Sequence, residues 1–109
     1  MQNDIAYLTD ILESAKIAIS YLENISFEEF ETNNQTQDAV IRRLEMIGEA
    51  SSRVSIQMQK TYSDLEWEKM KSMRNFLIHE YDDIDMKIVW DTVKKNLPPL
   101  ILDLQKIVS

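Results

Sequence analysis

Glycine and proline, the residues that most often mark turns, are almost absent from this chain. One glycine, Gly48, and two adjacent prolines, Pro98 and Pro99, are all that 109 residues contain. A β-rich fold needs many tight turns, so this scarcity favours helices joined by short polar connections. The length is typical of one domain with one hydrophobic core. We therefore expect a single all-α domain over residues 1–109.

Apolar residues recur at steps of three and four along four stretches, which predicts four amphipathic helices. They run from Asp4 to about Glu23, from Thr36 or Gln37 to about Gln59, from Ser63 or Asp64 to about Tyr81, and from Asp83 or Asp85 to the C-terminal region. Asp4 is expected to cap the first helix. Ser26 and Glu29 have the spacing of a capping box, which predicts a short additional helix ending near Glu31. The simplest architecture is an antiparallel four-helix bundle with this short helix added.

Three local features sharpen this prediction. Ser63 and Glu66 form a second possible capping box, at the start of the third long helix. Pro98-Pro99 is expected to kink the last helix or to start a new one. Gly48 falls inside the second helix, where glycine costs about 1 kcal/mol relative to alanine. A close approach by another helix would explain the glycine better than a functional requirement does, although both interpretations remain open.

The chain is acidic, with a formal net charge of -7. Bulk charge therefore does not attract nucleic acid, and any RNA site needs a local basic cluster, such as Lys69, Lys71 and Arg74. No apolar run approaches the roughly 20 residues of a membrane span, and the N-terminus lacks the features of a signal peptide. The chain also has no cysteine, which fits a reducing compartment. We expect a cytoplasmic protein without a membrane segment.

The segment from Arg74 to Tyr81 holds the side chains best suited to chemistry. His79 is the only histidine of the chain, Arg74 precedes it by five positions and Tyr81 follows it by two. An imidazole can move protons near neutral pH, and a guanidinium can stabilise a phosphate. Asn75 shares a helix face with His79 and can orient a phosphate or the imidazole. These four candidate catalytic residues predict cleavage of RNA by attack of a ribose 2′-hydroxyl, with no cofactor and no metal.

Helix geometry separates Arg74 from His79, because five residues correspond to about 140° around the axis. A two-fold homodimer would bring two copies of this helix to one cleft, and would also supply both a base and an acid. On spacing alone, two simpler readings stay open: a histidine that stabilises a helix end, and an arginine in a surface ion pair. The nearby aspartates suit capping and turn formation better than a metal site.

The sequence also resembles a known family. Arg74-Asn75-x3-His79-x-Tyr81 is similar to the Arg-x4-His-x-Tyr motif of HepT-like proteins, which are small members of the HEPN superfamily of helical ribonucleases. Ile47-Gly48-Glu49-Ala50 resembles the strongest signature of this family outside the motif. Ser72 stands where many relatives carry glycine, a departure that we expect to be harmless. The resemblance covers nearly the whole chain.

The resemblance implies a toxin of a type VII-like toxin–antitoxin pair, active as a metal-independent endoribonuclease. The implied partner is a MntA-type minimal nucleotidyltransferase, which transfers AMP from ATP to the motif tyrosine, here Tyr81. A charged nucleotide beside Arg74 and His79 would repel RNA and silence the site. The resemblance also implies a homodimer with a composite cleft. The alternative is a non-catalytic helical partner that binds a nucleotidyltransferase and assists its substrate binding.

Overall fold

The structure is a computed structural model that describes residues 2–79 and 84–108. Every regular element in these ranges is helical, which confirms the predicted all-α class. The elements are α1 (Gln2–Tyr21), α2 (Phe27–Glu31), α3 (Asn34–Arg53), α4 (Ile56–Thr61), α5 (Trp67–His79), α6 (Met86–Asp91), the π-helical segment η2 (Thr92–Asn96) and α7 (Leu97–Val108). None of these helices is long and apolar enough to cross a membrane.

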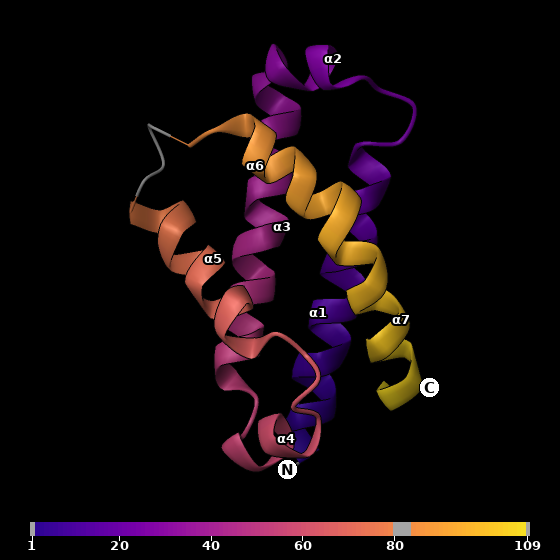
Figure 1. Cartoon of the computed structure of the whole chain (residues 1–109), viewed down its shortest axis with the longest axis vertical. Coiled ribbons are helices and arrows are strands. Elements are labelled where there is room, and N and C mark those ends of the chain that lie inside the picture. Colours follow the sequence, from indigo (N-terminus) through magenta and orange to yellow (C-terminus); the bar gives the residue numbers. More distant parts are fainter. Residues whose placement is uncertain (1, 80–83, 109) are drawn as a thin grey trace.

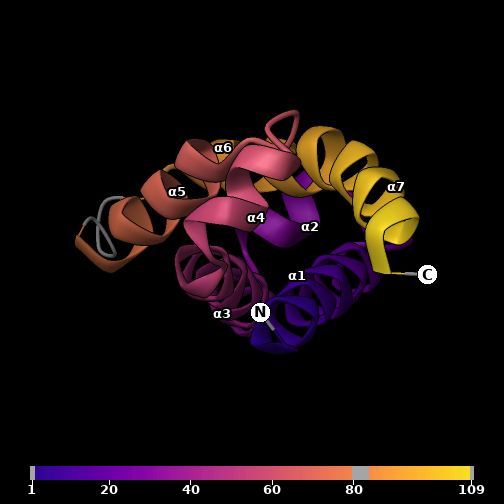
Figure 2. The ribbon, with the colours of Figure 1, turned by 90° about the horizontal axis from the view of Figure 1, so that it is seen from below.

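The long helices form an antiparallel bundle of the predicted kind (Figure 1). α1, α3 and α5 alternate in direction, and α6, η2 and α7 continue one another as the fourth rod. α2 lies at the end of the bundle where α1 leads into α3, and α4 lies at the opposite end, between α3 and α5. Figure 2 shows α1 and α3 side by side, with α5 and the α6–α7 rod arranged over them. α3 thus packs against both α1 and α5.

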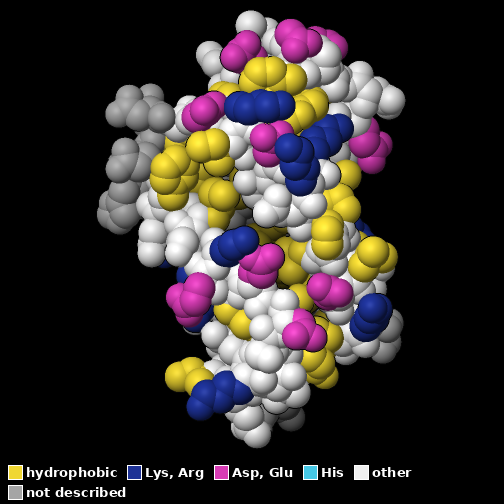
Figure 3. Space-filling view, viewed as in Figure 1, with side chains coloured by type: hydrophobic (Ala, Val, Ile, Leu, Met, Phe, Trp, Pro, Cys, Tyr) yellow, Lys and Arg dark blue, Asp and Glu magenta, His cyan; other side chains and the backbone are white. Residues whose placement is uncertain are grey.

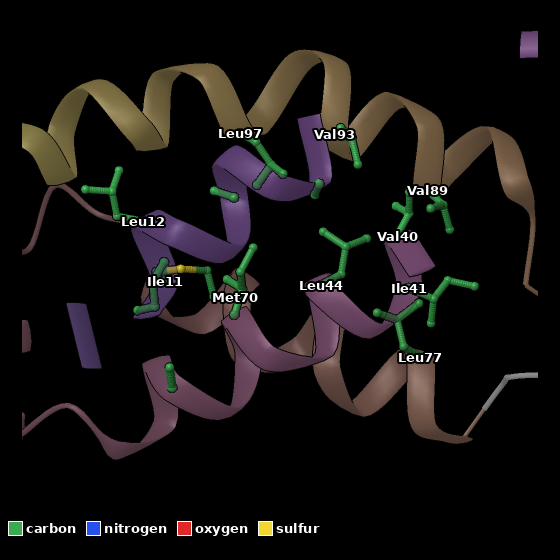
Figure 4. Close-up of a cluster of buried hydrophobic side chains, with 14 of the residues drawn as sticks. Ile11, Leu12, Val40, Ile41, Leu44, Met70, Leu77, Val89, Val93 and Leu97 are labelled. Carbon is green, nitrogen blue, oxygen red and sulfur yellow. The ribbon is translucent and has the colours of Figure 1, made fainter. Parts of the chain in front are cut away.

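The core is apolar and continuous through all four rods. α1 and α3 supply more of its buried side chains than any other helix, because each has an apolar stripe with helical spacing. Figure 4 shows side chains of α3, α5 and α6 directed into this core, among them Ile41, Leu77 and Val89. At the α2 end, the ring of Phe30 is fully buried and packs 5.6 Å from the ring of Trp90. A buried side chain of this size contributes roughly 1.5–3 kcal/mol.

The start of α1 differs from the prediction. Asp4 does not cap α1, because α1 begins at Gln2 and Asp4 lies inside its first turn. The Asp4 carboxylate is buried and accepts hydrogen bonds from the backbone N–H of Ser55 at 2.8 Å and from the Ser55 hydroxyl at 2.7 Å. The Asp4 side chain therefore binds the residue that begins another helix, α4. No local capping pattern could reveal this contact.

The same contact explains why α3 stops at Arg53 and does not reach Gln59 as predicted. The backbone of Val54 is extended, and Ser55 accepts a hydrogen bond from the N–H of Met58 and so caps the separate helix α4. Asp4 holds Ser55 in this position from the far end of the sequence. A tertiary hydrogen bond thus overrides the continuous helical periodicity of this stretch.

Other caps were predicted with mixed success. The capping box of Ser26 and Glu29 is present, and Asp85 caps α6 by accepting from the N–H of Lys87 at 2.8 Å. The alternative cap, Asp83, lies outside the described residues. Asn33 caps α3, which therefore begins two to three residues before the predicted start.

The predicted second capping box was wrong. Ser63 lies in a turn, and α5 begins only at Trp67. Leu65 and Trp67 are both buried, and the indole N–H of Trp67 donates to the Tyr62 carbonyl at 3.0 Å, so this turn folds inward before the helix starts. The two prolines do start a new helix, since they occupy the first turn of α7 directly after η2, where missing N–H groups are tolerated.

Candidate functional site

Three of the four predicted site residues belong to one helix. Arg74, Asn75 and His79 all lie on α5, and His79 is its last residue. Arg74 is partly buried and Asn75 is exposed. The side chain of His79, and Tyr81 as a whole, lie outside what the structure describes. The expectation that the four side chains meet at one site therefore stays a prediction.

Arg74 sits where the backbones of α3 and α5 come into contact. A Cβ atom added to Gly48 would overlap the Cβ of Arg74 and would lie only 2.9 Å from the carbonyl oxygen of Met70. Real Cβ atoms essentially never approach another atom so closely. The close-approach explanation for the mid-helix glycine is thus confirmed, and the helix that approaches is the one that carries the motif.

The guanidinium of Arg74 forms no ion pair and no hydrogen bond with any part of residues 2–79 and 84–108. Its two neighbours in the predicted basic cluster do have partners: Lys69 pairs with Glu66 at 2.7 Å, and Lys71 donates to Gln59 at 3.1 Å. Among the residues that the structure describes, Arg74 is therefore the member of this cluster whose donors have no partner. The simpler reading of Arg74 as a surface ion-pair partner finds no acceptor among the described residues.

Hydrogen bonds from Trp67 and Lys71 fix the first half of α5. Gln59 accepts from Lys71 and donates from its own amide to the carbonyl of Val54 at 2.9 Å. The indole N–H of Trp67 is held by Tyr62, as described above. Through these bonds α4 ties the start of α5 to the end of α3. The helix that carries the candidate residues is thus anchored before the motif begins.

A groove of about 680 Å³ runs along the other side of α5. Its walls include Met73 and Phe76 on α5 and Ile88 on α6, with Leu44 and Ile47 of α3 also lining it. Figure 3 shows apolar side chains in the hollow between α5 and the α6–α7 rod. Sequence reasoning missed this groove; the available signal was apolar residues away from the predicted buried stripes, such as Ile88, which is 46% exposed.

The groove and Arg74 lie on different sides of α5. Arg74 is not among the residues that line the groove, whereas Ser72 and Phe76 are. Position 79 follows Ser72 by seven residues and Phe76 by three, so the helical register places it on their stripe of α5. The predicted separation of positions 74 and 79 around the helix therefore holds for the backbone.

Among the described residues, no three His, Cys, Asp or Glu side chains form a group that could hold a metal ion.

Comparison with known proteins identifies the family. The family model described as "Ribonuclease HepT-like" matches residues 11–107. These residues run from the middle of α1 to α7 and make up nearly all of the chain. The chain belongs to this HepT-like ribonuclease family. Membership agrees with the all-α bundle and with the motif residues on α5.

Several curated sequences are similar over most of the chain. A protein of Thermococcus cleftensis named "Probable ribonuclease HepT" is 39% identical over 94 residues, which cover 86% of both chains. A Methanocaldococcus jannaschii protein provisionally named RNase MJ1380 is 40% identical over 95 residues, or 87% of both chains. A longer protein of the same organism, named as a gamma-glutamylcyclotransferase and provisionally as RNase MJ0434, is 36% identical over the whole chain, which spans 50% of that protein's length. No solved structure matches significantly.

Proposed function

We propose that this protein is an endoribonuclease that cleaves RNA without a metal ion. The ribose 2′-oxygen attacks the adjacent phosphorus, and the bond from phosphorus to the 5′-oxygen of the next nucleotide breaks. A base takes the proton of the 2′-hydroxyl, and an acid gives a proton to the departing 5′-oxygen. The products are a 2′,3′-cyclic phosphate and a 5′-hydroxyl. Family membership supports the ribonuclease class of this reaction.

The observation that carries the proposal is the lack of an acidic partner for Arg74 among the described residues. Its side chain is partly buried against α3, yet its guanidinium has no acidic partner in the described parts of the chain. A guanidinium without an acidic partner can bind a phosphate through paired, charge-assisted hydrogen bonds. Arg74 is the proposed group that stabilises the negative charge on phosphorus in the transition state.

The remaining roles belong to the neighbours of Arg74 in the motif. His79 is the proposed group for proton transfer, because imidazole can both take and give a proton near neutral pH. Asn75 is exposed on the same helix, four residues before His79, so it can orient the phosphate or the imidazole. Tyr81 is proposed to hydrogen-bond the substrate or to help position His79.

The separation of Arg74 from position 79 supports a homodimer with a composite site. On one α5, the two positions lie about 140° apart around the axis. A two-fold axis near α5 would let Arg74 of one protomer and His79 of its partner face the same phosphate. Two histidines in one cleft would also divide the work of base and acid between them. The homodimer is thus the proposed active form.

Regulation is proposed to act on Tyr81. A MntA-like nucleotidyltransferase would transfer AMP from ATP: the tyrosine oxygen bonds to the α-phosphorus, the bond to the β-phosphate breaks, and pyrophosphate leaves with the phenolic proton passed to solvent. The added phosphodiester and nucleoside would exclude RNA from the site. The protein would then be the toxin of a type VII-like toxin–antitoxin pair. Because both RNA and ATP are cytoplasmic, we place this activity in the cytoplasm.

Cleavage by the purified protein tests the proposal. Total RNA is incubated with a titration of protein in the presence of a chelator, and the new 3′ ends are analysed. We expect 2′,3′-cyclic phosphates, and we expect His79→Ala and Arg74→Ala to stop cleavage while the proteins keep wild-type circular dichroism and oligomeric state. Absence of cleavage by the wild-type dimer would refute the proposal. For the regulation, co-expression with the nucleotidyltransferase should add AMP increments to the intact mass that Tyr81→Phe loses.

A second candidate function is a non-catalytic partner that binds a nucleotidyltransferase and assists its substrate binding. The net charge of -7 favours this reading, because an acidic surface opposes RNA binding. The same experiment separates the two functions. A wild-type protein that leaves RNA intact but lowers the KM of the nucleotidyltransferase for its substrate would be this partner.

A further inference from the structure

The geometry points to Gly48 as a positioning residue for Arg74, an inference that rests on the proposed function. Gly48 lies on α3, outside the motif, and touches no substrate in this proposal. It acts because its missing side chain lets the motif helix approach α3 at the level of Arg74. Its place in the chain, 26 residues before Arg74, gives no hint of this link.

The contact involves the backbone of Arg74 and of the preceding turn. A Cβ at position 48 would overlap the Cβ of Arg74, would lie 3.2 Å from its Cα and would lie 2.9 Å from the carbonyl oxygen of Met70. None of these atoms belongs to the far end of a flexible side chain. A methyl group at position 48 therefore cannot be accommodated by a rotamer change. At this level α3 and α5 have to move apart.

The other attachments of α5 determine how that movement would act. Trp67 and Lys71 hold the first half of the helix through their bonds to Tyr62 and Gln59. Gly48 meets α5 just beyond these bonds, at Met70 and Arg74. With its start tied, α5 would respond to the methyl group by tilting away from α3. Arg74 and every motif position after it would then be displaced from the composite site.

Even a small tilt of α5 matters for catalysis. Misplacement of a catalytic group by about 1 Å can cost about 100-fold in rate. Substrate contacts elsewhere in the cleft would be less affected, so the loss should fall on kcat more than on KM. Helix propensity works in the opposite direction, because alanine favours helix more than glycine does. A loss of activity in Gly48→Ala would thus come from the clash and not from a weaker α3.

The test compares Gly48→Ala with Leu104→Ala in the full-length dimer. Leu104 is fully buried on α7, which packs on α1, so its truncation weakens the core away from α5. We expect Gly48→Ala to lower kcat about 100-fold with KM changed less than about threefold, and Leu104→Ala to keep kcat near wild type at a temperature where both are folded. A wild-type kcat in Gly48→Ala, or an equal loss in Leu104→Ala, would overturn the inference.

A second readout does not depend on RNA cleavage. Backbone amide chemical shifts should change most within residues 67–77 in Gly48→Ala, and these shifts should change little in Leu104→Ala. Changes confined to α3 would overturn the positioning role even if the protein cleaves RNA. If the wild type fails to cleave RNA, the proposed function falls, and the amide shifts alone decide whether Gly48 positions Arg74.

A double variant covers the case in which Gly48→Ala does not fold. Arg74→Gly removes the Cβ that the new methyl group would overlap. Adding Gly48→Ala should therefore destabilise the Arg74→Gly protein less than it destabilises the wild type, as measured by urea denaturation. Equal destabilisation in both backgrounds would mean that the two positions do not meet as described, and would overturn the inference.

Discussion

Helix α3 packs against its two long neighbours in different ways. Against α1 the seam belongs to the apolar core, to which α1 contributes fully buried residues such as Leu8 and Ile11. Against α5 it forms a seam in which Gly48 lets the backbones meet and Arg74 lies at the contact. The first seam excludes water and stabilises the bundle. The second seam places Arg74 where its guanidinium has no partner among the described residues, which suits binding of an anion.

The comparison implies that mutations in the two seams have different effects on stability and on RNA cleavage. Loss of an apolar contact in the α1–α3 seam should lower stability and leave the chemistry of a folded molecule intact. Changes in the α3–α5 seam should alter RNA cleavage far more than stability. The following predictions test this division, and they proceed from the largest expected effect to the smallest.

The largest effect is expected from Arg74 in the α3–α5 seam. Arg74→Ala should lower kcat/KM for RNA about 1,000-fold, because it removes the group that stabilises the developing negative charge. Arg74→Lys keeps the charge and loses the two-pronged donor geometry, so its loss should be intermediate. Initial cleavage rates measure both, and urea denaturation should show little change in stability. Equal rates for the wild type and Arg74→Ala would place catalysis elsewhere.

Leu8 tests the α1–α3 seam. Its side chain is fully buried, so Leu8→Ala should lower the free energy of unfolding by about 3 kcal/mol through lost burial and a residual cavity. Urea denaturation measures this loss. The cleavage rate per folded molecule should remain that of the wild type, since Leu8 lies on α1 and not on α5. A cleavage defect as large as that of Arg74→Ala would show that the two seams are not separable.

The division between seams also explains what the sequence could reveal. Apolar periodicity predicted the buried stripes of α1 and α3, because such a stripe repeats every turn and dominates the pattern. The lone mid-helix glycine correctly indicated a close helix approach, but one residue cannot name its partner. That α5 is the partner, and that Arg74 is the contact, depend on the packing of residues 26 positions apart.

Helix ends were harder to predict where distant residues decide them. Ser26 and Glu29 cap α2 as predicted, because both partners of that capping box lie within four residues. The end of α3 and the role of Asp4 were missed, since Asp4 binds Ser55 across 51 positions. At the candidate site, the motif residues could be chosen from their chemistry and from the family resemblance. The groove beside α5 could not, because it is formed jointly by α3, α5 and the α6–α7 rod.

Ser55 offers a test with a smaller expected effect. It lies between α3 and α4 and binds Asp4 of α1. Its hydroxyl accepts from the N–H of Met58 as the cap of α4 and donates to the carboxylate of Asp4. Ser55→Ala should therefore cost about 1 kcal/mol, the usual loss for an N-cap. Ser52→Ala is the matched control, because the exposed Ser52 hydroxyl donates only to the carbonyl of Glu49 on its own helix. A loss in Ser52→Ala as large as in Ser55→Ala would argue against a special role for this cap.

The smallest effect is expected from the pH dependence of the Asp4 contact. The hydrogen bond from the Ser55 hydroxyl, and then that from its backbone N–H, lowers the pKa of the Asp4 carboxyl below its ordinary value, and the opposing effect of burial does not cancel them. A lowered folded-state pKa means that the unfolded chain binds the proton more readily. The stabilisation is therefore complete above the ordinary pKa of about 3.9 and is lost as the pH falls through the folded-state value.

The stability difference between the wild type and Asp4→Asn should follow this rule. It should be constant near neutral pH and should shrink once the pH falls below about 4, where protonation of the wild-type carboxyl removes its charge. Urea denaturation at a series of pH values measures the difference. Asp10→Asn is the control, because Asp10 lies on the same helix and is exposed. A difference for Asp4→Asn that does not change with pH would show that shape and not charge holds α1 to the start of α4, and the α1–α3 seam would then owe its stability to packing alone.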